Sequence, residues 1–417
     1  MLKTISISHS PNAQKDDILL ALKLLFSPIS WFNFRETEKL EREFASYFGK
    51  DYKALAVNSA RSAEYLILKS QNIGQGDEVI VQGFTCVAVP NSVLWNSAKP
   101  VYVDVDNTFN IEATDLKRKI TKKTKAVIVQ HSFGIPANIT KIKNAVANKK
   151  ILIIEDCALS LGAKYNGKKV GTLGDISFFS FGRDKVISGV FGGMILVKDR
   201  KLYERIKEIR DDLDYPSWRW VFQQLMHPLV LSLVLPLYNF GYKKVTLGKI
   251  ILFLFQKFRF ITKSIYEEEK YARKPSVFPK KLPGGLATLA FNQIKKLDEF
   301  NIHRKKISEL YFRILKDKRV ILPPKISGAI WMRFPILTKK ATDIFNYAKS
   351  KGILLGDWYR SPIMPVKNYN LVKFNPNSCP TSAKYSQMII NLPTYPNLSK
   401  NDARFIVKTI KKCLHTK

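Results

Sequence analysis

The sequence predicts an α/β protein with a large, mainly parallel sheet domain and a smaller α+β domain at its C-terminus. Three observations predict this class. Strands alternate with helices between about residues 52 and 197, several strands are continuous apolar runs, and a compact mixed pattern follows residue 286. Alternation of this kind is typical of a parallel sheet covered by helices on both faces. A length of 417 residues also favours two domains over one core.

The elements of the large domain follow from local periodicity. Apolar residues at helical spacing predict a first helix over 36–48, which ends at Gly49. Strands are predicted at 52–57, 78–82, 99–104, 125–130, 151–154, 176–181 and 194–197, and further helices at 59–70, 85–95 and 140–149. In such sheets ligands bind at the carboxyl ends of the strands, so polar residues at those ends are the first candidates for a site.

The C-terminal part has a different pattern of apolar residues, with more helical than strand spacing. Apolar residues every three or four positions predict one long helix over 286–316, followed by a strand at 329–334 and helices at 342–350 and 400–413. We therefore expect a large domain over residues 1–300 and a small α+β domain over 301–417.

Residues 216–285 interrupt the large domain as an apolar, basic insertion. The runs LVLSLVLPL and IILFLF, split by Lys243 and Lys244, are each too short for a membrane span, which needs about 20 apolar residues. Two interpretations stay open. Residues 216–262 form a hairpin in a bilayer surface, with lysines such as Lys243 and Lys244 on lipid phosphates, or they form an arm that packs against a dimer partner.

Composition excludes several classes of protein. The formal net charge is +35, but the basic residues are spread along the chain and no nucleic-acid-binding motif accompanies them, so we expect no nucleic acid as partner. Five histidines without ligand spacing predict no metal site. Four cysteines without paired spacing and a start without a secretory signal predict a cytoplasmic protein, or one at the inner face of the membrane.

Three features carry chemistry. The strand end IIED leaves Asp156 where a buried carboxylate faces a ligand. The stretch 171–193, GTLGDISFFSFGRDKVISGVFGG, places Lys185 in a glycine-bounded loop directly after a buried strand. Residues 58–63, NSARSA, put small polar residues and an arginine at a strand-to-helix junction, where helix-start amides hold phosphates.

With these features the sequence resembles the DegT/DnrJ/EryC/StrS family of sugar aminotransferases. The segments that carry the resemblance are GDEVIVQGFTCVAVPNSVLWNSAKPVYVDVD, IIEDCALSLGAKYNGKKVGTLGDISFFSFGRDK and CPTSAKYSQMIINLPTYPNLS, in the family's order. The resemblance implies a fold-type-I transferase that uses pyridoxal 5′-phosphate, with a site at a homodimer interface. It matches Lys185 to the lysine that binds the cofactor as a Schiff base and Asp156 to the acid that pairs with the pyridine nitrogen.

The resemblance also assigns the remaining cofactor contacts. Ser180 matches the serine that binds the cofactor phosphate, and Ser59, Ala60 and Arg61 stand where the family forms its phosphate cradle. Cys86 and Leu159 occupy positions beside the cofactor ring.

The sequence departs from the family at three of these positions and in one segment. Cys86 replaces a large aromatic that stacks on the ring, Leu159 replaces a Gln or His, and Gly182 replaces a histidine. The family's Gly-Tyr-Asn-Tyr-Arg segment, which reaches a neighbouring subunit's site, has no counterpart, and the insertion stands in its place. These departures leave the cofactor anchors in place and bear on the substrate.

The resemblance implies transamination of a keto sugar, nucleotide-linked in the family, with a glutamate-type donor, for polysaccharide or surface glycan synthesis. Two alternatives stay open at this point. One is a pyridoxal-phosphate sugar dehydratase, which the retained Lys185 disfavours. The other is a scaffold or regulatory protein on the same fold that has lost turnover.

Overall fold

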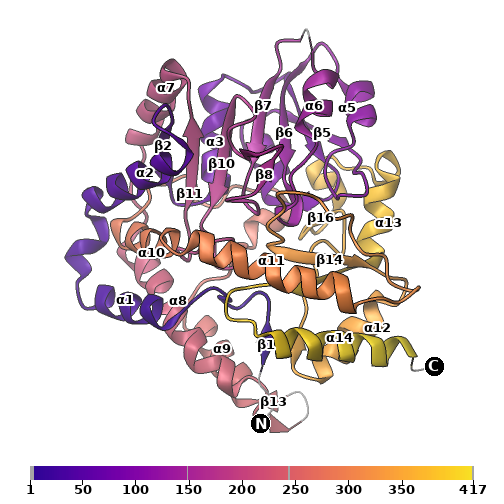
Figure 1. Cartoon of the computed structure of the whole chain (residues 1–417). Helices are drawn as coiled ribbons and strands as arrows, with labels where there is room; N and C mark the ends of the chain where they lie inside the picture. The colour runs from indigo at the N-terminus through magenta and orange to yellow at the C-terminus, as the bar shows by residue number, and fades with distance from the viewer. Residues whose placement is uncertain (1–3, 148, 243–244, 416–417) are drawn as a thin grey trace.

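The computed structural model describes residues 4–147, 149–242 and 245–415 and is built around a seven-stranded sheet of order β2-β11-β10-β7-β6-β3-β5 (Figure 1). Its strands are β2 (Lys53–Val57), β3 (Glu78–Gln82), β5 (Lys99–Val103), β6 (Thr124–Gln130), β7 (Leu152–Asp156), β10 (Ile176–Ser180) and β11 (Gly193–Val197). Every neighbouring pair from β10 to β5 is parallel, whereas β11 runs opposite to both β10 and β2. The predicted mainly parallel sheet is confirmed.

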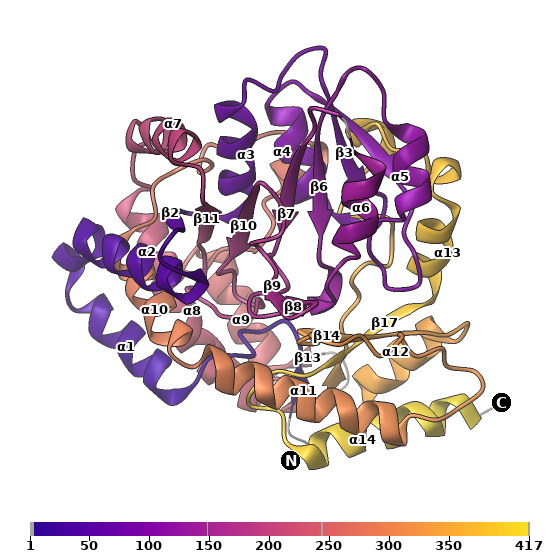
Figure 2. The same ribbon diagram turned by 45° about the horizontal axis from the view of Figure 1, so that its top comes forward.

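Helices cover both faces of the sheet, as Figure 2 shows. Successive strand residues point to opposite faces, so Ile153 and Ile154 belong to two different hydrophobic cores. On the face of Ile154 lie α3 (Ala60–Ser70), α4 (Ala88–Trp95) and α7 (Arg200–Asp211). On the face of Ile153 lie α2 (Phe34–Phe48), α5 (Ala113–Lys119), α6 (Ile139–Ala145) and α10 (Gly284–Ile294). Burial on both faces explains why these strands are continuous apolar runs in the sequence.

A third core forms the C-terminal unit, in the lower part of Figure 1. Its elements are the antiparallel strands β14 (Arg333–Leu337) and β17 (Ile389–Pro393) and the helices α11 (Leu297–Ile314), α12 (Ala341–Ser350) and α14 (Lys400–His415). Near the N-terminus, β1 (Ile5–Ser6) pairs in parallel with β15 (Ile353–Leu354), and Ile5 packs in the same core. These first residues therefore join the C-terminal unit, although the sequence assigned them to the large domain.

The insertion folds into a helical hairpin of α8 (Trp218–Leu237) and α9 (Leu247–Lys257). Val230 and Val234 of α8 and Ile261 form a small core, against which Ile251, Leu252 and Phe255 of α9 pack. On its other side α8 packs along α1 (Lys15–Leu25) and contacts α10. The predicted turn residues Lys243 and Lys244 lie outside the described residues.

Two short strand pairs lie outside the large sheet. They are β8 (Lys164–Tyr165) with β9 (Lys168–Lys169) and β12 (Gly241–Tyr242) with β13 (Val245–Thr246).

Several elements differ from the prediction. Helices α1, α5 and α7 have no predicted counterpart, and the strand predicted at 329–334 is β14, Arg333–Leu337. The helix predicted over 286–316 is two helices, α10 and α11, with a break at Lys295 and Lys296. Ile294 and Leu297 on the two sides of the break are both buried, so the apolar spacing continues across it and does not reveal it. The helix predicted over 85–95 starts as β4 (Thr85–Cys86), which pairs with β16 (Ile363–Met364) far along the chain. Helix α13 (Pro380–Met388) was not predicted, since few of its residues are buried.

Candidate active site

A cavity of about 550 Å³ lies at the carboxyl ends of β7 and β10 and collects all of the predicted site residues. They are Lys185, Asp156, Ser180, Ser59, Ala60, Arg61, Cys86 and Leu159. Residues that are distant in the sequence meet here because parallel strands end at the same edge of the sheet.

Lys185 follows β10 in a loop that the surrounding structure holds in place. Its backbone N–H donates to the Gly182 carbonyl (3.2 Å), and its own carbonyl accepts from the Asn12 side chain (2.5 Å). Its Nζ lies 4.7 Å from the centre of the Trp358 ring. Burial lowers the pKa of the Lys185 ammonium, the carboxylate of Asp184 opposes that shift, and Arg333 adds to it. A larger fraction of the amine is therefore neutral, which is the form that acts as a nucleophile.

Asp156 ends β7, the strand next to β10. One carboxylate oxygen, Oδ1, accepts from the Ala158 amide (2.9 Å), while Oδ2 makes no hydrogen bond within the part of the chain that the structure describes. Burial raises the pKa of Asp156, and the Ala158 N–H and the charge of Lys185 oppose the shift. The second oxygen is thus a buried acceptor that faces the cavity.

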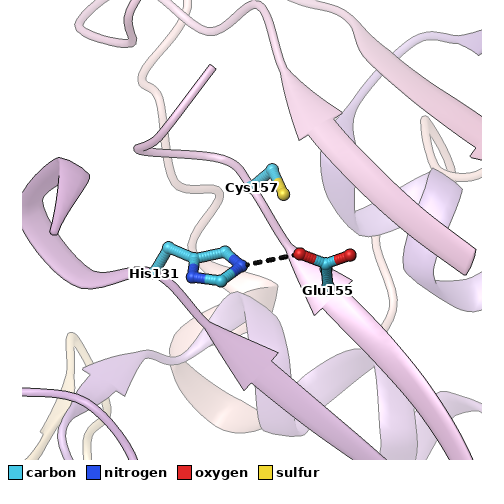
Figure 3. A group of neighbouring side chains, drawn as sticks. All are labelled: His131, Glu155 and Cys157. Atoms are coloured by element: carbon cyan, nitrogen blue, oxygen red, sulfur yellow. Dashed lines mark hydrogen bonds and ion pairs between the residues drawn. The ribbon is translucent and has the colours of Figure 1, made fainter. Parts of the chain in front are cut away.

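Glu155, the neighbour of Asp156 in the sequence, points toward His131 and holds the backbone instead of a ligand (Figure 3). Its two oxygens accept from the amides of Gly171, Leu173 and Gly174 (2.6–2.8 Å), and Oε2 lies 3.0 Å from His131 Nε2. Because His131 Nδ1 accepts from the Ala137 amide (2.9 Å), Nε2 carries the proton and donates to Glu155. Burial alone would raise the pKa of Glu155, but these bonds outweigh burial and lower it.

The cluster of His131, Glu155 and Cys157 has the side-chain types of a metal site. Its carboxylate and imidazole are committed to one another and to backbone amides, and burial raises the pKa of the Cys157 thiol well above its ordinary value. The arrangement therefore serves to fix β7, and with it Asp156, against the loop that precedes β10.

The start of α3 forms the other end of the cavity. Ser59 caps the helix by accepting from the Ser62 amide (3.1 Å), and its hydroxyl bonds with the Ser62 hydroxyl (2.8 Å). The Ser62 hydroxyl in turn donates to Asn58, so Ser59 is the donor in its bond with Ser62 and its own proton is committed. The first-turn amides of Ala60 and Arg61, which have no intrahelical acceptor, remain to bind an anion, together with the Ser180 hydroxyl.

A glycine allows this approach of β11 to α3. A Cβ added at Gly193 would lie 2.3 Å from the Ser59 carbonyl oxygen, closer than any side chain tolerates. The GlyGly that follows the lysine loop in the sequence is thus required by packing beside the phosphate end of the cavity.

Arg61 is held by the insertion instead of pointing only into the cavity. Its guanidinium pairs with the buried Glu269, which lies in the 3₁₀ turn Glu268–Tyr271, and donates to the Ser264 carbonyl (3.2 Å). It also lies 4.8 Å from the centre of the Phe278 ring. The predicted charged fork for a phosphate is therefore partly neutralised, and the ion pair ties α3 to residues 264–278.

Glu64 is a cavity residue that the sequence did not single out. It is buried, and its Oε1 has no hydrogen-bond partner among the described residues. Burial raises the pKa of Glu64 well above its ordinary value, and the charge of Asp156 adds to the shift, while Arg61 opposes it. Burial therefore favours the uncharged form of this carboxyl, whose Oε1 has no partner among the described residues.

The positions of the three family departures lie together with aromatic residues from the C-terminal unit. Cys86 is paired with Met364 across β4 and β16, and burial raises the pKa of its thiol. Trp358 and Tyr359, whose rings are stacked at 5.9 Å and 5°, line the same cavity beside Lys185. An aromatic surface is thus present although residue 86 does not provide it. The sequence analysis did not predict this aromatic surface, because Trp358 lies in a segment without regular structure, far along the chain from the motifs.

The insertion forms the remaining wall. Leu231 of α8, Leu252 and Gln256 of α9, and Ile261 and Thr262 line the cavity. Thr262 accepts from the buried Arg183, two residues before Lys185, through its carbonyl and its hydroxyl (2.6 Å each). The two interpretations of the sequence, a bilayer surface and a dimer partner, did not include a place in the cavity wall, because apolar runs do not reveal which elements they contact.

The cavity fits pyridoxal 5′-phosphate at each end of that molecule. The amine of Lys185 makes no hydrogen bond to a described residue and suits the aldehyde. The second oxygen of Asp156 suits the protonated pyridine nitrogen. The start of α3 and Ser180 suit the phosphate.

A family model described as the DegT/DnrJ/EryC1/StrS aminotransferase family matches residues 14–213 and 255–411. The chain belongs to this family. The resemblance seen in the sequence is confirmed, and with it the cofactor: DegT/DnrJ/EryC1/StrS aminotransferases depend on pyridoxal phosphate, and the chain is one of them. The unmatched residues 214–254 hold α8 and most of α9, so the family model does not account for most of the hairpin.

Relatives and solved structures agree with this membership. GDP-perosamine synthase of Escherichia coli O157:H7 is 40% identical over 40% of this chain, a match that spans 46% of that relative. The dTDP-3-amino-3,6-dideoxy-alpha-D-galactopyranose transaminase of Aneurinibacillus thermoaerophilus is 28% identical over 90% of each chain. A Helicobacter pylori aminotransferase involved in pseudoaminic acid biosynthesis has the same fold, with a TM-score of 0.75, 21% identity and 99% of each chain covered.

Proposed function

We propose that this aminotransferase converts a keto sugar, carried on a nucleotide, to an amino sugar with a glutamate-type donor, for polysaccharide or surface glycan synthesis. The observation that carries the proposal is the meeting of the Lys185 amine and the buried Asp156 carboxylate in one cavity with a helix start for phosphate. The relatives' names support the substrate class, since they include a GDP-linked and a dTDP-linked amino sugar.

Each residue has a role that follows from its surroundings. When bound, pyridoxal phosphate supplies the electron sink for the carbanion at the amino-bearing carbon. Lys185 would hold the cofactor through Nζ, and its neutral amine would serve as the base that takes the proton from the donor's amino-bearing carbon. Asp156 would accept a hydrogen bond from the pyridine nitrogen and keep it protonated. The amides of Ala60 and Arg61 and the Ser180 hydroxyl would hold the phosphate.

A homodimer belongs to the proposal, because the family resemblance places sites of this kind at a subunit interface. Light scattering on the purified protein measures the mass directly. A mass of one chain at all concentrations would remove the dimer from the proposal and leave the cavity complete within one subunit.

The absorbance spectrum of the protein with pyridoxal phosphate tests the site. We expect a visible band that is absent in Lys185→Ala and is converted by glutamate to the spectrum of the pyridoxamine form. Product analysis with glutamate and nucleotide-linked keto sugars then names the acceptor. A band that persists unchanged in Lys185→Ala would contradict the role of Lys185, and a band that glutamate leaves unchanged would contradict the donor.

A further inference from the structure

The outer face of α9 is apolar and uncovered. Leu247, Ile250, Phe253 and Leu254 have exposed fractions of 41%, 44%, 60% and 40%. They recur at helical spacing, and Phe258, the residue directly after the helix, is also exposed (61%). We call these five residues the α9 face. Contiguous exposed apolar patches on a protein mark interaction sites.

The charge around the α9 face has one sign. Residues 215–266 contain seven Lys and Arg and no Asp or Glu. Among the described residues, Lys257 and Arg259 are exposed at the C-terminal end of α9. An apolar helix face flanked by basic residues fits the boundary between the acyl chains and the anionic headgroups of a bilayer.

A second copy of the chain fits the face less well. In a two-fold dimer the same patch meets itself, which would place the basic residues of both copies side by side with no acid in the segment to pair with them.

The geometry favours lying on a membrane over crossing it. Helix α9 has 11 residues, about 16 Å, which is too short for a span. Helix α8 has 20 residues and is long and apolar enough for a span, which corrects the expectation from the sequence that its apolar run is too short. More than half of its most apolar stretch, however, is buried inside the protein, against α1 and the cavity. The hairpin therefore offers one face, that of α9, to a bilayer surface.

We propose that the α9 face docks this aminotransferase onto an anionic bilayer surface. The opposite side of the same helix carries Leu252 and Gln256, which line the active-site cavity. A helix is roughly 10 Å across, so docking holds the cavity about one helix diameter from the bilayer. The amino sugar then leaves the enzyme beside the membrane, where a glycosyl transfer to a lipid-anchored acceptor consumes it. This last step rests on the proposed function, whereas the docking does not.

Flotation of the purified full-length protein with lipid vesicles tests the docking without any sugar substrate. We expect binding to vesicles of phosphatidylcholine mixed with phosphatidylglycerol, weaker binding to phosphatidylcholine alone, and release as salt is raised. The variants Ile250→Glu and Phe253→Glu are expected to lower binding about tenfold or more, because each places a charge in the buried face. The variant Ile302→Glu is the matched control, since Ile302 on α11 is an isoleucine of comparable exposure (53%, against 44% for Ile250).

Circular dichroism and melting of each variant establish that the fold is kept, as expected for exposed positions. Equal loss of binding in Ile302→Glu, or no binding of the unmodified protein to anionic vesicles, would overturn the proposal. A change of mass in Ile250→Glu without vesicle binding would assign the α9 face to a second copy instead. The absorbance test at Lys185 is independent of all these outcomes, so failure of the docking leaves the proposed reaction standing.

Discussion

Two walls of the cavity are held in place by different interactions. One wall is formed by the sheet and the other by the α8–α9 hairpin. On the sheet wall, a hydrogen bond from the Ala158 amide fixes Asp156. Behind it, Glu155 accepts hydrogen bonds from three backbone amides and from the His131 ring. On the hairpin wall, Leu231 and Leu252 contribute apolar surface held by packing. Hydrogen bonds have directions and fix one geometry, whereas apolar packing tolerates sliding and exchange of side chains. The sheet wall is thus suited to chemistry and the hairpin wall to adapting the cavity to its substrate and surroundings.

The largest expected effect lies behind the sheet wall. Glu155→Ala leaves three buried amides and His131 without their acceptor, so the free energy of unfolding should fall by about 3–5 kcal/mol. Urea denaturation measures it. A loss below about 1 kcal/mol would show that the loop at Gly171–Gly174 finds other partners.

Asp156→Asn tests the same wall for chemistry. The amide keeps the acceptor for Ala158 and removes the negative charge, so stability should change little. The half-reaction with glutamate should slow about 10- to 150-fold, because a hydrogen bond to a charged group contributes roughly 1.5–3 kcal/mol. Stopped-flow absorbance measures the rate. An unchanged rate together with unchanged cofactor binding would show that Asp156 does not face the cofactor.

A pair of truncations sharpens the comparison within the hairpin. Val234→Ala in α8 deletes buried methyl groups and should lower the free energy of unfolding by about 2 kcal/mol. Leu254→Ala on the α9 face deletes a larger side chain and should change it by less than about 0.5 kcal/mol. Equal losses in thermal and urea unfolding would mean that the α9 face is covered by another chain in solution.

The smallest expected effect concerns pH. Burial lowers the pKa of Lys185 and is the larger effect, while the carboxylate of Asp184 raises it. Asp184→Asn removes that carboxylate and should therefore lower the pKa of Lys185 further. The amine is then neutral at lower pH, and the pH profile for the rate of cofactor attachment should move toward acid. Asp184→Glu keeps the charge and should leave the profile in place. A shift toward alkali in Asp184→Asn would contradict this account of the Lys185 environment.

Most of the candidate site was predictable because its residues belong to strand ends and helix starts. Asp156, Ser180 and Ser59 stand directly at such boundaries, and Lys185 lies in the loop that follows β10, where local periodicity fixes the element and the parallel sheet fixes the edge. Trp358, Glu64 and Glu269 were missed, because nothing within their own segments distinguishes a cavity residue from a core residue. The commitment of Arg61 to Glu269 was missed for the same reason, since it joins α3 to a turn far along the chain.

The sequence by itself determined the α/β class, the order of the strands along the chain and the candidate residues for holding the cofactor. These depend on periodicity and on motifs that are short in sequence. Only the tertiary structure decided that α8 is covered by α1 while α9 is left open, although both helices are rich in Leu, Val, Ile and Phe. Burial depends on which distant segment packs against a surface, and apolar composition measures only the tendency to be covered.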